Sequence, residues 1–258
     1  MQMVLKEFYK HQNIIQWVWF SLAILAIVFF VIIVKFRTRK KRNLNNLTAT
    51  AIFGGLSAVL YTLSFPIPLF PTFLKFQLSN IPAYIIGFSI DPISGFIVVL
   101  IRFLIKLPFT RTFVVGEAAD FMIGALSVLA SGYLYSKYRT YKGAIYSLVL
   151  GVIVWVMTSV VINRYILAPF YIKLFFNGNI YPFIGILEKA TFIKNVNETN
   201  YLDKYIYYAV IPFNFLLAAI TTITTFLVYK SLSKYIRTEK RNRGVDKLYD
   251  LLKIDRDI

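Results

Sequence analysis

Residues 14–34 read IIQWVWFSLAILAIVFFVIIV, a run of 21 residues without a charged side chain. An α-helix rises 1.5 Å per residue, so this run would reach roughly 31 Å, enough to cross the hydrocarbon core of a bilayer. Trp17 and Trp19 stand near its start, as in the aromatic belts of membrane proteins, and the basic segment 35–42 follows at once. A secretory signal has the reverse order, with its basic region before the apolar core. The run therefore predicts an N-terminal anchor helix.

Six further apolar segments follow this helix. They cover residues 47–64, 81–90, 93–105, 113–135, 143–167 and 206–229. Hydrophobic residues make up 58% of the chain and charged residues only 16%, whereas soluble domains carry about 25% charged residues. We therefore predict an all-α integral membrane protein. An anchor helix and basic linker (1–46) would precede a six-helix, substrate-binding body (47–232) and a basic tail (233–258).

The net charge is +17, from 29 Lys and Arg against 12 Asp and Glu. If the linker after the anchor helix is cytoplasmic, the segments 35–46, 136–142 and 230–258 share one side and carry about twice the Lys and Arg of the opposite side. The positive-inside rule then predicts a cell-membrane protein with its N-terminus outside and its C-terminus in the cytoplasm. The same rule accounts for the basic tail, so no nucleic-acid partner is needed.

Several kinds of chemistry are excluded by the residues that the chain lacks. It has no cysteine and one histidine, His11, which rules out thiol catalysis and His-rich metal sites. It also has no Gly-x-x-x-x-Gly-Lys-Ser/Thr loop for ATP and no Gly-x-Ser-x-Gly nucleophile motif. We expect no catalytic residues, no metal and no cofactor, and a binding or transport role in place of an enzyme.

Polar side chains inside the apolar segments are costly and often functional. Glu117 and Asp120 are three residues apart and would share a helix face, while Asn163 and Asn214 lie near the outer ends of two other segments. The carboxylates could instead be solvated at a helix end, and each Asn could simply join two helices. Together, these groups indicate a pocket that opens toward the outer side. Aromatic residues near them could stack on a flat ligand: Phe65, Phe70, Phe73, Phe76, Phe113, Tyr171 and Phe213.

Small residues recur at helical spacing in the first segment of the body. They are Ala51, Gly54, Gly55 and Ala58. A face of small side chains lets another helix approach closely. The partner could be a helix of this chain or a second membrane protein, and the pattern alone leaves both open.

The chain resembles the S components of energy-coupling factor (ECF) vitamin transporters, most closely the riboflavin-specific type. The resemblance covers roughly residues 47–232. It rests on these motifs: the small-residue helix 51–58, the loop FPIPLFP (65–71), LKFQLSNIP (74–82), GEAADF (116–121), Asn163 with Pro169 and Tyr171, and IPFN (211–214). Each motif alone is weak, whereas their order and spacing together are fairly specific.

The resemblance implies a binding subunit that captures riboflavin outside the cell and associates with a transmembrane coupling subunit and two ATPases, which alone use ATP. It implies that the small-residue helix meets the coupling subunit. It also implies a substrate site made of Lys75, Phe76, Gln77, Glu117, Asp120, Asn163, Tyr171 and Asn214, in which the two Asn residues bind the pyrimidine edge of the flavin. The chain departs from the pattern at Asp120, where relatives usually carry Asn, and at Leu217, where some carry a polar residue.

Two other hypotheses remain open. An S component for folate or pantothenate should place basic residues around a carboxylate ligand, and only Lys75, Lys106, Arg111 and Arg164 are candidates. A membrane scaffold without a transported ligand would use the basic segments 35–42 and 230–243 on anionic lipid. Saturable binding of one vitamin would separate these hypotheses.

Overall fold

The computed structural model describes residues 44–110 and 114–229. The predicted anchor helix at 14–34, the basic tail at 233–258 and Phe113 lie outside the described residues. All six segments that the sequence predicts for the body coincide with helices. Their lengths differ from the prediction, because several continue beyond the apolar run.

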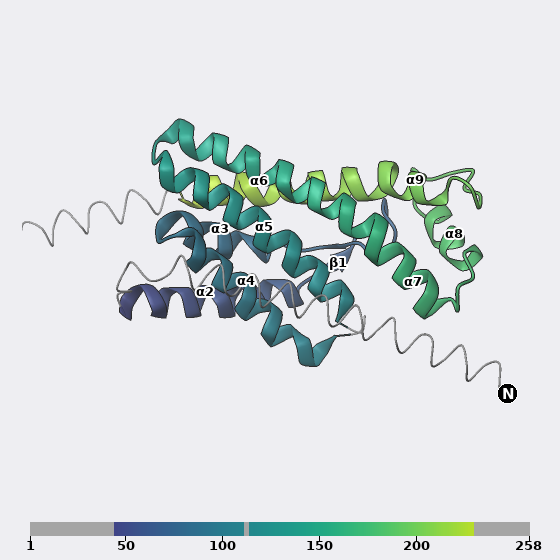
Figure 1. Cartoon of the computed structure of the whole chain (residues 1–258), viewed down its shortest axis with the longest axis horizontal. Helices are drawn as coiled ribbons and strands as arrows, with labels where there is room; N and C mark the ends of the chain where they lie inside the picture. Colours follow the sequence, from purple (N-terminus) through teal and green to yellow (C-terminus); the bar gives the residue numbers. More distant parts are fainter. Residues whose placement is uncertain (1–43, 111–113, 230–258) are drawn as a thin grey trace, which may run out of the picture. The chain divides into compact units, whose positions relative to one another are not determined.

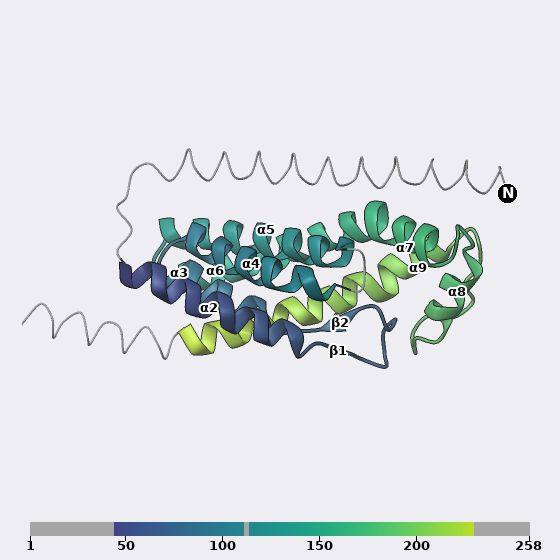
Figure 2. The same cartoon turned by 90° about the horizontal axis from the view of Figure 1, so that it is seen from below.

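The chain enters the body through α2 (Leu44–Thr62). The prolines of the following loop prevent a helix, and the chain forms a small hairpin in which β1 (Phe65–Pro66) pairs antiparallel with β2 (Lys75–Phe76). Helix α3 (Asn80–Ser89) is short and runs back along the body (Figure 2).

A tight turn at Asp91 begins the next pair of helices. The Asp91 carboxylate accepts a hydrogen bond from the Ser94 amide at 2.8 Å and caps the N-terminus of α4 (Pro92–Lys106). A single 3₁₀ turn, η1 (Leu107–Phe109), ends this helix, and α5 (Val115–Lys137) then returns along the body.

Two long helical stretches complete the body, and each contains a π turn just before a proline. The first comprises α6 (Tyr141–Ile162), η2 (Asn163–Leu167) and α7 (Ala168–Phe175). The second comprises α9 (Tyr201–Tyr205), η3 (Ile206–Val210) and helical residues 211–229. Proline cannot donate the backbone hydrogen bond and crowds the carbonyl four residues before it, which favours a wider turn. Pro169 and Pro212 each follow their π turn by two residues.

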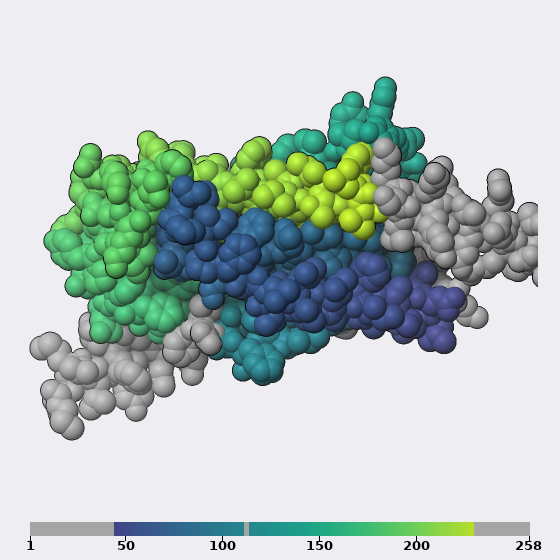
Figure 3. All heavy atoms as spheres, turned by 180° about the vertical axis from the view of Figure 1, so that it is seen from behind, coloured from purple at the N-terminus to yellow at the C-terminus, as the bar shows by residue number. Residues whose placement is uncertain are grey.

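Helices α2, α4, α5 and α6 and the helical residues 211–229 run lengthwise beside one another (Figure 1). The hairpin, the start of α5, α7, α8 (Tyr181–Glu188) and α9 all lie at one end, which we call the hairpin end. Figure 3 shows the opposite face, where α2 (purple) and residues 211–229 (yellow) flank the residues between them, and the blue hairpin lies against green residues of the same end.

Four helical stretches among the described residues are long and apolar enough to cross a membrane. They are Pro92–Phe109, Val115–Lys137, Tyr141–Phe175 and Tyr201–Tyr229. Many large apolar side chains on these stretches are exposed, such as Met157 and Ile223, which is the arrangement expected of a surface that faces lipid. The fold is therefore that of an all-α membrane protein.

The small residues of α2 point in two directions. Gly54 and Ala58 are buried, and a Cβ at Gly54 would lie 2.8 Å from Ile101 of α4. Gly54 therefore lets α2 approach α4, and these two residues do not belong to an outward docking face. Ala51 is exposed, and a Cβ at Gly55 would meet nothing within 4 Å. Only this second pair remains available to another protein.

Candidate functional site

A cavity of about 600 Å³ lies toward the hairpin end of the body. The end of α2, the hairpin, the start of α5, the α6–α7 stretch and residues 213–217 all contribute to it. Its lining includes the polar side chains of Tyr61, Thr62, Ser64, Lys75, Gln77, Lys106, Glu117, Asp120, Trp155, Asn163, Tyr171 and Asn214. Phe73, Leu167, Phe213 and Leu217 are among the apolar residues that complete it.

Seven of the eight residues expected at a substrate site line this one cavity. They are Lys75, Gln77, Glu117, Asp120, Asn163, Tyr171 and Asn214. Phe76 does not line it. Its ring instead packs on the Phe65 ring across the hairpin, with 5.5 Å between the centroids. Neighbouring residues of a strand point to opposite sides, so Lys75 and Gln77 can face the cavity while Phe76 faces away from it.

Asn163 opens the π turn of the α6–α7 stretch. Its Nδ2 donates to the carbonyl of Ser159 at 2.8 Å, and its Oδ1 accepts from the hydroxyl of Tyr205 at 2.5 Å. The carbonyl can only accept, so these contacts define which end of the amide is nitrogen. One N–H and one oxygen lone pair of Asn163 remain beyond these two bonds.

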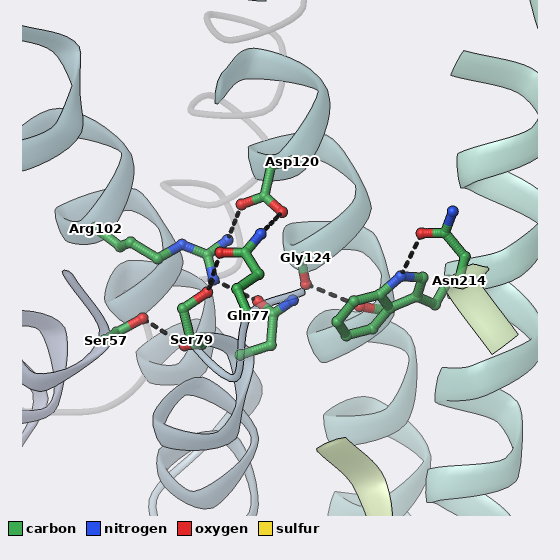
Figure 4. Close-up of polar contacts among 10 residues, drawn as sticks. Ser57, Gln77, Ser79, Arg102, Asp120, Gly124 and Asn214 are labelled. Atoms are coloured by element: carbon green, nitrogen blue, oxygen red, sulfur yellow. Dashed lines mark hydrogen bonds and ion pairs between the residues drawn. The ribbon is translucent and has the colours of Figure 1, made fainter. Parts of the chain in front are cut away.

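Asn214, in the helical residues 211–229, is held in the same manner. Its Nδ2 donates to the carbonyl of Val210 at 2.9 Å, and its Oδ1 accepts from the indole Nε1 of Trp155 at 3.1 Å (Figure 4). The indole N–H is a donor only, which again sets the orientation of the amide. The two Asn side chains therefore bring matching donor and acceptor capacity to one cavity.

Glu117 lies in the first turn of α5 and is buried. The hydroxyl of Thr110 donates to Glu117 Oε2 at 2.7 Å and accepts from the backbone amide of Val114 at 3.0 Å. Val114 has a φ of 70°, a left-handed conformation that is unusual for a β-branched residue. The start of α5, with its carboxylate, is thus held by a side chain from the preceding loop.

Asp120 is paired inside the protein. Its Oδ2 accepts from Arg102 Nη2 at 2.8 Å, and its Oδ1 accepts from Gln77 Nε2 at 2.6 Å (Figure 4). Both side chains come from segments that are far from Asp120 in sequence. The charge of this carboxylate is therefore balanced by a buried arginine of α4.

A cluster of aromatic rings surrounds Phe73, a residue of the hairpin loop that lines the cavity. This ring stacks on Phe183 of α8, with 5.7 Å between centroids and 15° between planes. It also makes edge contacts with Tyr171 at 6.0 Å and Tyr205 at 5.6 Å. The four rings join the hairpin loop to α7, α8 and α9.

Two lysines stand at the cavity. Lys75 is exposed on the hairpin, and Lys106 lies over the ring of Tyr61 with its Nζ 5.2 Å from the centroid. Within residues 44–110 and 114–229, no three His, Asp or Glu side chains gather where they could hold a metal ion. Aromatic walls with amide groups suit a flat heterocycle that carries carbonyl and N–H groups.

Sequence reasoning does not single out Tyr61, Trp155 or Tyr205. For Trp155 a signal exists, because Trp155, Ser159 and Asn163 follow each other at intervals of four and share a helix face. For Tyr61 and Tyr205 there is no such signal, since their neighbours in space come from distant segments.

Comparisons with known proteins agree on one family. The family model described as the substrate-specific component of ECF transporters matches residues 45–229. The riboflavin transporter RibU of Staphylococcus aureus (strain TCH60) is 27% identical over 202 residues, which cover 77% of this chain and 97% of that protein. RibU of Streptococcus thermophilus is 30% identical over 81% of this chain and 92% of its own length, and the riboflavin transporter FmnP of Bacillus subtilis is 23% identical over 75% and 95%.

A solved structure has the same fold. It is the S component of a bacterial ECF transporter, and it superimposes with a TM-score of 0.57 at 23% identity, covering 74% of this chain and 97% of that one. At this identity the likeness concerns the fold alone. It agrees with the helical body described above.

Proposed function

Because this chain belongs to the substrate-specific components of ECF transporters, we propose that it binds riboflavin in the cavity at the hairpin end. The observation that carries the proposal is the pair of oriented amides, Asn163 and Asn214, facing one cavity of about 600 Å³. Ligand cavities of drug-sized molecules span about 300–1,000 Å³. The relatives that are named riboflavin transporters support the choice of ligand.

The chemistry of riboflavin matches this lining. The isoalloxazine ring is flat, and its pyrimidine edge alternates carbonyl oxygens with an N–H. Asn163 and Asn214 each keep one donor and one acceptor for such an edge. Phe73 and Phe109 line the cavity and are partly exposed, so a ligand could bury their apolar surface, which would contribute at about 25 cal/mol per Å².

The remaining steps of transport would involve other proteins. In this proposal the hairpin end faces the outside, and a coupling subunit with two ATPases drives release into the cell. Ala51 is exposed and a Cβ at Gly55 would meet open space, which supports contact with the coupling subunit, since small side chains permit close approach of a second helix.

Titration of the detergent-purified full chain with riboflavin tests the proposal. We expect saturable, one-to-one quenching of riboflavin fluorescence that excess folate or pantothenate does not reverse. Displacement by either competitor would assign the cavity to that vitamin, for which the lysines at the cavity would then bind a carboxylate. Absence of riboflavin binding to well-folded protein would overturn the proposal.

A further inference from the structure

Arg102 is a buried cation in the middle of an apolar helix. It is 1% exposed and lies within Pro92–Phe109, one of the stretches long and apolar enough to cross a membrane. A charged side chain at such a position is costly, and its partners usually show its purpose. Arg102 does not line the 600 Å³ cavity, so any effect on a ligand must pass through other residues.

The guanidinium binds three side chains from two segments, the start of α3 and the first half of α5. Nη1 donates to Ser79 Oγ at 2.6 Å and to Asn80 Oδ1 at 2.8 Å, while Nη2 donates to Asp120 Oδ2 at 2.8 Å. The planar fork of arginine can serve all three acceptors at once, whereas the single ammonium of a lysine cannot keep this geometry.

Two of these partners hold the two ends of one cavity side chain, Gln77. Its Nε2 donates to Asp120 Oδ1 at 2.6 Å, and its Oε1 accepts from the Ser79 hydroxyl at 3.0 Å. Figure 4 shows Gln77 lying between these two groups, with Arg102 beside both. Gln77 therefore keeps one N–H and one lone pair for a ligand, and its orientation is set by Asp120 and Ser79.

The protein makes room for this arrangement. Gly124 lies one turn after Asp120 on α5, and a Cβ there would stand 2.7 Å from Asn80 Oδ1 and 3.0 Å from Arg102 Nη2. The Ser57 hydroxyl also donates to the carbonyl of Ser79 at 2.6 Å, which ties the same segment to α2. Helices α2, α4 and α5 thus jointly fix the chain that carries Gln77.

From this geometry we propose that Arg102 is a positioning residue for the ligand. Through Asp120 and Ser79 it fixes the orientation of the Gln77 amide, and this amide would then hydrogen-bond to the polar edge of the ligand. The inference rests on the proposed function, because it assigns Gln77 to a ligand contact. It also gives a reason for the aspartate at position 120, since a carboxylate can accept from Arg102 and Gln77 together, whereas an asparagine would set its own N–H₂ against one of these donors.

A double-mutant cycle on riboflavin binding tests the coupling between Arg102 and Gln77. Gln77→Ala and Arg102→Lys should each raise the dissociation constant by about tenfold. If Arg102 acts through Gln77, the double variant should also lose about tenfold and not a hundredfold, because residues that share one interaction are not additive. Additive losses, or an unchanged affinity of Arg102→Lys, would overturn the inference.

Ser79→Ala provides a second route that keeps the buried ion pair. It removes only the hydroxyl between Arg102 and Gln77, and it should weaken binding in the wild-type background but not in the Gln77→Ala background. Arg139→Lys, at an exposed arginine away from the cavity, is the matched control and should change nothing. Failure of the wild-type chain to bind riboflavin would instead refute the proposed function.

Discussion

The indole Nε1 of Trp155 donates a hydrogen bond of 3.1 Å to Oδ1 of Asn214, which joins α6 to the helical residues 211–229. Both side chains line the cavity, and Trp155 is only 2% exposed. The bond fixes the Asn214 amide before any ligand arrives. A site with pre-oriented polar groups loses less conformational freedom on binding.

Replacing Asn214 by alanine should weaken riboflavin binding by more than about 1 kcal/mol, the usual cost of leaving a buried polar group unpaired. The loss arises because the ligand edge would lose the donor and the acceptor that Asn214 keeps for it. Fluorescence titration measures the effect. Asn179→Ala, on an exposed loop outside the cavity, serves as the control. Unchanged affinity would remove Asn214 from the ligand site.

Trp155→Phe tests whether Trp155 acts by orienting the Asn214 amide or by offering an aromatic surface to the ligand. Phenylalanine keeps an aromatic surface but cannot donate to Asn214, so the dissociation constant should rise about threefold to tenfold. In an Asn214→Ala background the same change should add little, because the bond it removes is already absent. Isothermal titration of the four proteins gives the coupling. Equal losses in both backgrounds would show that Trp155 acts by contact alone.

Phe73→Ala should weaken the packing of the hairpin loop against α7, α8 and α9. It removes one stacked and two edge contacts, each worth about 0.5–1.5 kcal/mol. We expect riboflavin dissociation to accelerate about tenfold in stopped-flow experiments, with a smaller change in the association rate. Phe192→Ala is the control, since Phe192 is exposed outside this cluster. Equal dissociation rates in wild type and Phe73→Ala would show that this ring does not help to retain the ligand.

Gly54 and Gly55 are neighbours on α2 with opposite expectations. Gly54→Leu would push into Ile101 and should destabilise the protein by about 1–3 kcal/mol, visible as a lower thermal midpoint. Gly55→Leu meets open space, and leucine is the better helix former by up to about 1 kcal/mol, so stability should hold or rise.

The same pair tests the proposed contact with a coupling subunit. Gly55→Leu should retain riboflavin binding yet reduce both co-purification with the coupling subunit and riboflavin uptake by cells. Normal uptake by Gly55→Leu would place the partner elsewhere on the body.

Local sequence features were sufficient to predict the helices of the body. Apolar runs of sufficient length and the prolines that interrupt them depend only on neighbouring residues, and each predicted body segment is helical. Between α7 and α9 the local signal was weaker, because the helix in that interval, α8, is only eight residues long. The helix ends at 175 and 201 also escaped prediction, since the π turns continue both stretches past their apolar segments.

For the site, the sequence identified residues but not their roles. Glu117 and Asp120 were expected to share one face, and both line the cavity, but only the structure pairs Asp120 with Arg102 across 18 positions of sequence. Phe76 was expected over the pocket, yet the pairing of β1 with β2 turns its ring toward Phe65.

The sequence by itself determined that this is a helical membrane protein with the motifs of its family, because hydrophobicity, charge bias and proline act over a few residues. The tertiary structure alone decided which polar groups meet. Gly54 and Gly55 show the reason, since two identical adjacent residues differ only in what the rest of the fold places beside them. The Arg102–Gln77 network likewise exists only where three helices and a hairpin converge.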